Sequence, residues 1–321
     1  MIISVVIATH NRASLLAATL DRLRQQQYQP GDEVIIVDNA STDATSQVVA
    51  RAAKEFPVSL QYRRDMSPGK APALNAAMAE ARGDVLALTD DDVLVAPDWI
   101  QMIRCLFTDP DVGLVGGRVD PRWQQPAPRW LQVEHQGCYG PMSSPLALLH
   151  YGEAQELGKR TAVGANMAVR RTVFEALGGF SPSLGKRRGT LLGGEDRDLC
   201  QRAAGAGYRC QYRPELQVQH WIPAERTRLR YFLRWFFWSG ITNAILETTP
   251  GSAGTDTHPA ASPLNLLRRF IVGTASAPVQ ALSGRAANAA AQAMDAAFAL
   301  GYLAVRLGGR NMQRESGGFS G

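Results

Sequence analysis

The sequence contains few cysteines and no apolar run long enough to cross a membrane. Its 321 residues include only Cys105, Cys138, Cys200 and Cys210, and no two of these have the Cys-x-x-Cys spacing of a structural zinc site. We expect them to stay reduced, which favours the cytoplasm as the compartment. The best candidate for a membrane span, Ala296–Val305, is shorter than the roughly 20 residues that a spanning helix needs.

Glycine is absent from the segment that follows the first predicted strand. Residues 2–8 form a β-branched run typical of a buried parallel strand, and residues 8–12 read Ala-Thr-His-Asn-Arg. Because the sequence begins directly with this strand, we expect no signal peptide. A nicotinamide-dependent oxidoreductase would carry Gly-x-Gly-x-x-Gly here, which excludes that class. A nucleotidyltransferase would carry a glycine-rich, basic loop and stays only as the alternative enzyme class.

The net charge is +5 and the isoelectric point is near 9.2. Such a balance suits ligands that bear phosphate, nucleic acid or an anionic membrane surface. The sequence has no helix-turn-helix, zinc finger or aromatic-basic sheet motif, so we expect no nucleic-acid partner.

Strands and helices alternate in the first third of the chain. Hydrophobic periodicity predicts strands at residues 2–8, 33–37, 59–63 and 85–88, and helices at 14–26, 43–54 and 71–81. Ser41 or Thr42 is the predicted N-cap of the second helix, and Arg82-Gly83 the predicted C-cap of the third. This order predicts an α/β fold with a doubly wound, mostly parallel central sheet, whose ligands bind beyond the carboxyl ends of the strands.

The remainder of the chain is less regular. Its many prolines and two tryptophans predict long loops and edge strands at residues 112–160. Further along, a strand is predicted at 162–170, helices at 172–177 and 195–206, and a Gly-rich loop at 181–194. Beyond residue 225 the predictions are an aromatic and basic helix at 228–246, a linker at 248–263, one or two alanine-rich helices at 264–307 and a frayed tail from residue 308.

Three consecutive carboxylates, Asp90, Asp91 and Asp92, follow the fourth predicted strand. Adjacent carboxylates repel one another unless a cation compensates them, and Mg²⁺ or Mn²⁺ prefers such hard oxygen ligands together with substrate phosphates. The alternative is a solvated acidic turn before a helix.

Asp38 ends the second strand, where a carboxylate can accept hydrogen bonds from a base or a ribose hydroxyl. Its alternative role is a helix N-cap.

These segments together resemble a family 2 glycosyltransferase of the GT-A fold. The similarity runs over about residues 1–225 and is carried by VVIATHNR (5–12), VDNASTD (37–43), ARGD (81–84) ahead of TDDD (89–92), GANMAVRR (164–171), GGF (178–180) and GEDRDLCQR (194–202). Each motif alone is weak, whereas their order and spacing are specific. The resemblance implies a catalytic domain at 1–225, with a nucleotide-binding half at about 1–115 and an acceptor-binding half at about 116–225, followed by a C-terminal helical region at 226–321.

The resemblance also implies roles for individual residues. Asp92 and Asp90 would hold a divalent metal, Mg²⁺ or Mn²⁺, with Asp91 as a substitute for Asp92, and His220 resembles a further metal ligand of some GT-A enzymes. Asp196 matches the general base of inverting members, with Glu195 as the alternative. The residues implied to line the nucleotide-sugar are Ala8, Thr9, His10, Arg12, Asp38, Lys70, Asn75, Asp90, Asp91, Gly164, Ala165 and Asn166.

Two of these roles have plain structural alternatives. A pair of acids at a helix start is favoured by the helix dipole alone, and a lone histidine after a strand is more often structural.

Residues 230–235 partly resemble the Gln-x-x-Arg-Trp motif of processive synthases, with Tyr231 in place of glutamine. Since no membrane span is predicted, we expect a non-processive enzyme.

The function implied is an inverting, metal-dependent transfer of one sugar from a UDP-sugar to a glycan or lipid-linked acceptor, in the synthesis of cell-surface polysaccharide or glycoconjugates. A non-catalytic, glycan-binding relative is the alternative outside the enzymes. The aromatic and basic helix at 228–246 suits either an interfacial helix on an anionic membrane or a helix packed on the catalytic domain. The expected location is therefore the cytoplasm, with peripheral contact at the inner face of the membrane as one alternative.

Overall fold

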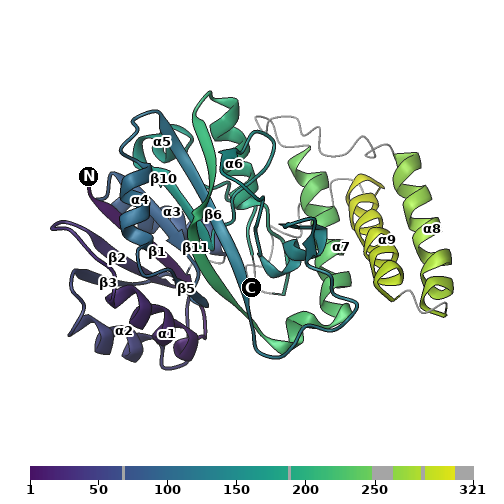
Figure 1. Cartoon of the computed structure of the whole chain (residues 1–321), viewed down its shortest axis with the longest axis horizontal. Coiled ribbons are helices and arrows are strands. Elements are labelled where there is room, and N and C mark those ends of the chain that lie inside the picture. The colour runs from purple at the N-terminus through teal and green to yellow at the C-terminus, as the bar shows by residue number, and fades with distance from the viewer. Residues whose placement is uncertain (67–68, 187–188, 248–262, 283–285, 308–321) are drawn as a thin grey trace. The chain divides into compact units, whose positions relative to one another are not determined.

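The computed structural model describes residues 1–66, 69–186, 189–247, 263–282 and 286–307, so the tail from residue 308 and all but the last residue of the predicted linker at 248–263 lie outside the described residues. The chain divides into two compact units (Figure 1). Unit 1 consists of Met1–Gln124, Val133–Arg188 and Glu195–Ile222. Unit 2 consists of Gln125–Gln132, Gly189–Gly194 and Pro223–Gly321.

The main sheet of unit 1 has the order β3-β2-β1-β4-β10-β6-β11-β5, and β9 pairs with β11 beside it. β10, β5 and β9 run antiparallel to their partners, and the other pairs are parallel. The elements of unit 1 are β1 (Ile3–Thr9), α1 (Ala13–Arg24), β2 (Glu33–Asp38), α2 (Thr45–Ala53), β3 (Ser59–Arg64), α3 (Lys70–Glu80), β4 (Val85–Thr89), β5 (Val93–Val95), α4 (Trp99–Leu106), β6 (Val112–Trp123), β7 (Glu134–His135), β8 (Cys138–Tyr139), β9 (Gln155–Glu156), β10 (Asn166–Arg170), α5 (Arg171–Ala176), α6 (Glu195–Gly205) and β11 (Arg209–Ile222), with a 3₁₀ turn at Pro141–Leu146.

The predicted alternation of strands and helices in the first third is confirmed. β1, β2 and β4 are buried along their whole length except for the half-buried Ala8, as their β-branched and aliphatic residues predict. In the parallel register Thr9 lies opposite Asp38, so β1 and β2 end at the same edge of the sheet. Helix α1 buries Leu16, Thr19, Leu20 and Leu23 on one face, which is the predicted helical spacing.

Two predicted helix caps are wrong. Helix α2 begins at Thr45, and it is Asp43 Oδ1 that accepts the Thr45 backbone N–H at 3.1 Å, whereas Ser41 Oγ accepts the N–H of Asn11. Helix α3 ends one residue before an extended Ala81. A Cβ on Gly83 would lie 2.4 Å from the Ser4 backbone nitrogen, so this glycine permits close packing against β1 rather than capping the helix.

The prediction of loops and edge strands at residues 112–160 is wrong for its first part. Residues 112–123 form β6, a central strand between β10 and β11. The predicted strand at 162–170 begins only at Asn166. His220, predicted to follow a strand, lies within the 14-residue strand β11. Between α5 and α6 the described residues form no helix or strand, which agrees with the predicted loop.

Close contacts of the backbone explain the glycines of β6. A Cβ on Gly117 would lie 2.2 Å from Asn166 Nδ2 and 2.3 Å from the carbonyl oxygen of Leu216. Both neighbours belong to the centre of the sheet, so neither has room to retreat. The glycine therefore lets β6 and β11 pair where the strand register shifts, between Arg213 and Gln217.

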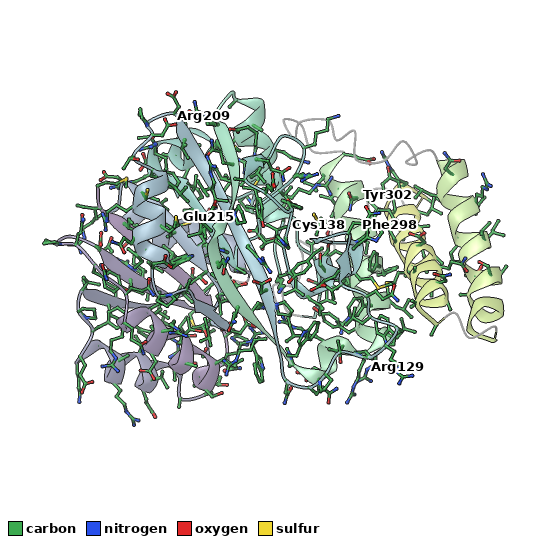
Figure 2. The ribbon with its side chains drawn as sticks, viewed as in Figure 1. Arg129, Cys138, Arg209, Glu215, Phe298 and Tyr302 are labelled. Carbon is green, nitrogen blue, oxygen red and sulfur yellow. The ribbon has the colours of Figure 1, made fainter. Side chains whose placement is uncertain are left out.

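Unit 2 contains the helices α7 (Leu229–Leu246), α8 (Pro263–Leu282) and α9 (Ala286–Leu307), which agree with the predicted helices. Glycines let them pack closely, since a Cβ on Gly301 of α9 would lie 1.9 Å from the Phe237 carbonyl oxygen of α7. Phe298 and Tyr302 stack along α9 with ring centroids 6.5 Å apart (Figure 2). Of the helices that the structure describes, none is long and apolar enough to pass through a bilayer.

We expect Gly117→Ala to lower the free energy of unfolding by about 1–3 kcal/mol, because the added methyl group overpacks a rigid part of the sheet. Gly140→Ala is the matched control, since its φ of −87° suits alanine and the nearest atom to the new Cβ lies 3.6 Å away. Chemical denaturation of both variants measures the difference. Equal stability of the two would contradict the packing argument.

Candidate functional site

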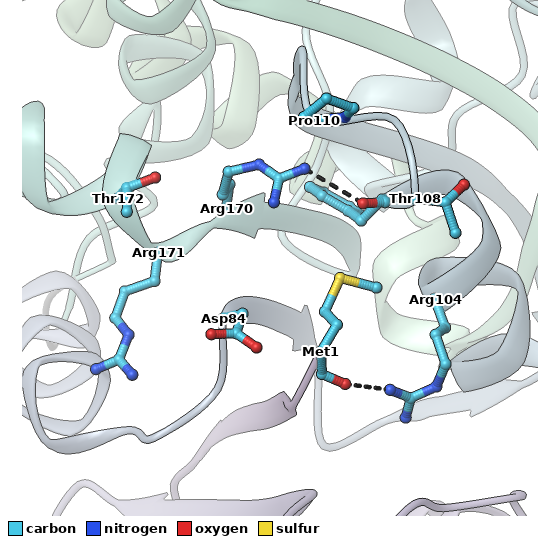
Figure 3. Close-up of a pocket in the computed structure, with 9 residues that line it drawn as sticks. Met1, Asp84, Arg104, Thr108, Pro110, Arg170, Arg171 and Thr172 are labelled. Atoms are coloured by element: carbon cyan, nitrogen blue, oxygen red, sulfur yellow. Dashed lines mark hydrogen bonds between the residues drawn. The ribbon is translucent and has the colours of Figure 1, made fainter.

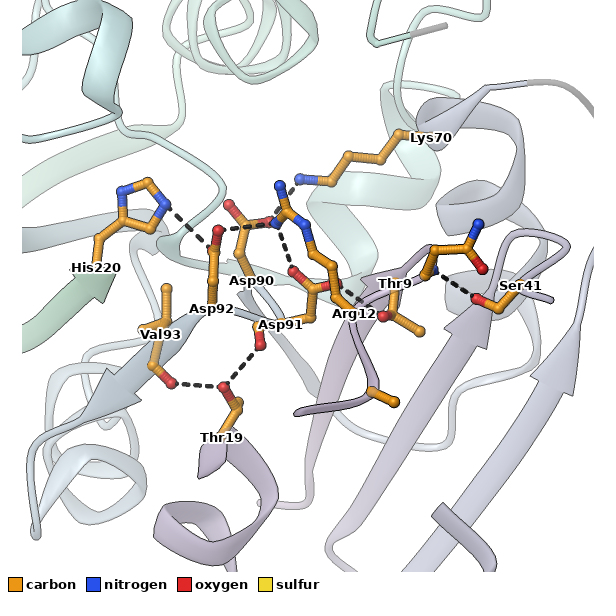
Figure 4. Close-up of polar contacts among 12 residues, drawn as sticks. Thr9, Arg12, Thr19, Ser41, Lys70, Asp90, Asp91, Asp92, Val93 and His220 are labelled. Atoms are coloured by element: carbon orange, nitrogen blue, oxygen red, sulfur yellow. Dashed lines mark hydrogen bonds and ion pairs between the residues drawn. The ribbon is translucent and has the colours of Figure 1, made fainter. Parts of the chain in front are cut away.

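Five of the predicted site residues lie at the carboxyl ends of the parallel strands, and four of them, Thr9, Asp90, Asp91 and Asp92, are labelled in Figure 4. Thr9 ends β1, Asp38 ends β2, and Asp90, Asp91 and Asp92 form the turn between β4 and β5. This is the edge at which open α/β sheets bind their ligands. The site lies entirely in unit 1.

Asp91 is held by the end of β1. The Thr9 hydroxyl donates to Asp91 Oδ2 at 2.7 Å, and Arg12 Nη1 donates to Asp91 Oδ1 at 2.9 Å. Burial raises the pKa of Asp91, and the neighbouring Arg12 opposes that rise. Both carboxylate oxygens of Asp91 therefore already have protein partners.

Asp90, Asp92 and His220 form a group that fits a divalent metal. One ligand atom from each lies within 4.8 Å of the others. His220 Nδ1 lies 2.7 Å from the carbonyl oxygen of Leu146, and only a protonated Nδ1 can donate to that acceptor. In neutral imidazole Nε2 then carries the lone pair, and it lies 3.2 Å from Asp92 Oδ1. Two carboxylates and an imidazole oriented through its other nitrogen are the donors of many metal sites.

Lys70 and His220 lie on opposite sides of Asp90 and Asp92 (Figure 4). Lys70 is the first residue of α3, and its Nζ lies 2.7 Å from Asp90 Oδ1. Burial alone would raise the pKa of Asp90, but the charge and hydrogen bond of Lys70 together with the charge of Lys186 lower the pKa overall. Asp90 thus stays ionised, with the ammonium group of Lys70 beside it.

Asp196 and Glu195 open helix α6. Asp196 Oδ2 accepts the backbone N–H of Gly164 at 2.7 Å, and a Cβ on Gly164 would lie 3.0 Å from Asp196 Oδ1. Burial and the charge of Glu195 raise the pKa of Asp196 to about 7, although Lys70 lowers it. A carboxyl group that titrates near neutrality is suited to exchange a proton during a reaction.

Of the predicted nucleotide-binding residues at the ends of β1 and β2, Asp38 is buried and His10 is exposed. Asp38 is 1% exposed, and it accepts the backbone N–H of Ser41 at 2.8 Å and the hydroxyl of Tyr62. His10 is exposed, and its Nδ1 lies 2.7 Å from the carbonyl oxygen of Asn39. Tyr62 carries no signal in the sequence, because its approach to Asp38 depends on the pairing of β2 with β3.

Asn75 and Asn166 have structural partners. Asn166 is fully buried, donates to the carbonyl oxygens of Arg118 and Leu216, and accepts the indole N–H of Trp99. Asn75 bridges the backbone N–H and carbonyl oxygen of Phe180. Contact of these side chains with a nucleotide-sugar stays a prediction.

The segment next to Asn166 reaches the site through its main chain. The carbonyl oxygen of Ala165 accepts the hydroxyl of Thr89, the last residue of β4, at 3.0 Å. Since the Gly164 N–H binds Asp196, this short segment joins the aspartate turn to α6. Ala8 is half-buried near the end of β1 and brings no polar side chain.

A cavity of about 630 Å³ lies at the opposite edge of the sheet, near the amino ends of β1 and β4 (Figure 3). Three of its lining residues are Arg104, Arg170 and Arg171. Their guanidinium groups donate to backbone carbonyls, and Arg104 also pairs with Asp32 at 2.6 Å. These arginines fasten strand ends and helices together, and we assign the cavity no role in the chemistry.

Comparison with known proteins gives the site a context. The family model described as glycosyl transferase family 2 matches residues 4–178. The chain is 25% identical over 260 residues to the glucosyl-dolichyl phosphate glucuronosyltransferase of Haloferax volcanii, covering 80% of this chain and 80% of that protein. It is 28% identical over 238 residues to protein y4gI of Sinorhizobium fredii, which covers 70% of this chain but only 25% of that longer protein.

A solved structure extends the similarity to the fold. The chain resembles the mannosyltransferase PcManGT from Pyrobaculum calidifontis in complex with GDP-Man and Mn²⁺, with a TM-score of 0.66 and 25% identity, covering 94% of this chain and 86% of that one. The fold predicted from the sequence, a GT-A fold with a mostly parallel sheet and C-terminal helices, is thereby confirmed.

Proposed function

Because the chain belongs to glycosyl transferase family 2, we propose that it is an inverting, metal-dependent glycosyltransferase that moves one sugar from a UDP-sugar to a glycan or lipid-linked acceptor. The observation that carries this proposal is the group of Asp90, Asp92 and His220, with Asp196 nearby across Lys70. The group would hold a metal and, through it, the diphosphate of the donor, and Asp196 is a carboxylate able to take a proton.

The donor end follows from the carboxylates and Lys70. Asp90, Asp92 and His220 would hold Mg²⁺ or Mn²⁺, and a bound ion there supplies positive charge for the leaving diphosphate. Lys70, now paired with Asp90, would shift toward that diphosphate. Asp38 would lie beside the uracil or ribose, and Gly164 and Ala165 beside the sugar.

Asp196 would act as the general base. It would accept the proton of the acceptor hydroxyl as that oxygen bonds to the anomeric carbon and the bond from that carbon to the diphosphate breaks. Attack from the side opposite the diphosphate inverts the anomeric carbon. The charge of Lys70 opposes a further rise in the pKa of Asp196, so a substantial fraction of the Asp196 carboxyl groups is ionised near neutral pH.

Two relatives bear on the substrates. The Haloferax volcanii protein is named for glucosyl-dolichyl phosphate, a lipid-linked sugar, which supports a lipid-linked acceptor and a role in glycoconjugate synthesis. PcManGT was solved with GDP-Man, which makes a guanine nucleotide the competing donor.

We also propose that unit 2 makes peripheral contact with an anionic membrane surface. Its described segments carry eight arginines and three acids. On α8, Leu267, Ile271 and Val272 are 46%, 55% and 49% exposed, and the exposed Arg268 lies among them. Apolar residues beside arginines, with no acid on the same helix, are suited to the headgroup region of a bilayer.

The metal and donor are tested by turnover. With Mn²⁺, we expect the purified protein to hydrolyse a UDP-sugar slowly, and EDTA or Asp92→Asn to lower the rate at least about 100-fold, because the charge on the leaving diphosphate is then uncompensated. Asp21→Asn, a surface acid of α1, should keep the rate. Faster turnover of GDP-sugars overturns the choice of UDP, and no turnover of any nucleotide-sugar counts against the enzyme.

The general base is tested by pH. We expect kcat/KM to fall as the pH drops below about 7, since the pKa of Asp196 is about 7 and only its ionised form accepts a proton. Asp196→Asn should lower kcat by about 10²- to 10⁴-fold. Glu195→Gln should stay active and move the acidic limb to lower pH, because Glu195 raises the pKa of Asp196. An inactive Glu195→Gln variant together with an active Asp196→Asn variant would make Glu195 the base.

Membrane contact is tested by sedimentation with vesicles. We expect the chain to bind vesicles that contain phosphatidylglycerol and not vesicles of phosphatidylcholine alone, and Arg268→Glu to weaken binding by about fivefold or more. Ile271→Asp should weaken it as well, whereas Met66→Asp, at a 71% exposed position of unit 1, should not. Equal binding by all variants would refute the role of α8.

A further inference from the structure

Arg12 bridges two neighbouring carboxylates of the aspartate turn. Its Nη1 lies 2.9 Å from Asp91 Oδ1 and 2.8 Å from Asp92 Oδ2 (Figure 4). Asp92 is also a member of the group that fits a metal. Arg12 therefore already places a positive charge beside Asp92, one of the carboxylates on which a metal would depend.

The charges of this turn are partly balanced by the chain itself. Arg12 pairs with Asp91 and Asp92, and Lys70 pairs with Asp90. A divalent ion that approaches Asp92 meets the guanidinium on the same carboxylate. The repulsion between the two cations lowers the affinity for the free ion, since both share a part of the site with little water.

The Arg12 side chain has room to move although its backbone is fixed. It is 36% exposed, whereas the side chains of Asp91 and Asp92 are 5% and 3% exposed. Its carbonyl oxygen accepts the N–H of Leu16 in the first turn of α1, and the Asn11 side chain before it accepts the N–H of Thr42. A ligand can therefore draw the guanidinium away without disturbing the loop.

We propose that Arg12 is a positioning residue that occupies the Asp91–Asp92 pair as a built-in counter-cation and releases Asp92 to the metal when a nucleoside diphosphate arrives to bind its guanidinium. A diphosphate offers paired oxygens to the fork of an arginine, which is a better partner than one oxygen from each of two carboxylates. Metal and nucleotide then bind cooperatively, and each raises the affinity of the other by the same factor. This inference rests on the proposed function.

Binding of Mn²⁺ to the full chain tests the proposal without turnover. The free ion is followed by electron paramagnetic resonance, alone and with saturating UDP or GDP, for the unaltered chain, Arg12→Gln and Arg12→Lys. The control is Arg51→Gln, an exposed arginine on α2. We expect Arg12→Gln to bind Mn²⁺ alone at least about tenfold more tightly, because the competing charge is gone. We also expect the nucleotide to improve that affinity less than in the unaltered chain.

Arg12→Lys keeps a cation and should stay close to the unaltered chain in its affinity for Mn²⁺ alone. Unchanged or weaker binding of Mn²⁺ by Arg12→Gln, with a normal melting temperature, overturns the proposal and leaves Arg12 a simple nucleotide ligand. Weaker binding together with a lower melting temperature in both Arg12 variants also overturns it, in favour of a structural role. The expected binding pattern without transfer from any nucleotide-sugar would instead be a failure of the proposed function alone.

Discussion

The repulsion among three consecutive carboxylates is the constraint on which the site depends. Asp90, Asp91 and Asp92 lie in one tight turn, and the chain compensates them from separate elements. Lys70 comes from the start of α3, and Arg12 from the turn between β1 and α1. Because the two partners lie far apart in the sequence, the tertiary fold of unit 1 is what brings their charges to the turn.

The second half of the site depends on backbone contacts rather than charge. Ala165, just before β10, and His220, within β11, lie next to the aspartate turn. β6 pairs with both strands, and the close approach of its Gly117 to Asn166 and Leu216 permits that pairing. Gly164 then leaves room for the carboxylate of Asp196, whose Oδ2 it binds through its N–H. The proposed general base and the proposed metal site therefore lie at the same side of the sheet, although more than 100 residues separate Asp92 from Asp196.

The sequence predicts what is local and loses what depends on distant pairing. β1, β2 and β4, together with the acids that end β2 and follow β4, can be predicted because buried parallel strands are uniformly apolar and their ends are polar. β6 was missed because its glycines and Pro121 resemble a loop, and only its pairing with β11 makes it a strand. The Leu146 carbonyl that orients His220 is likewise invisible, since main-chain partners leave no trace in side-chain type.

Stability alone does not explain a buried acid pair bridged by an arginine. The cost of removing such charges from water often equals or exceeds their attraction, so an apolar turn would serve the fold as well. Thr9 also binds Asp91, so the contact of Arg12 with Asp92 is the one that would compete with a metal. Such an ion pair is useful where one partner is replaced by another during binding. Asp92 is the carboxylate that can bind either the guanidinium of Arg12 or a metal.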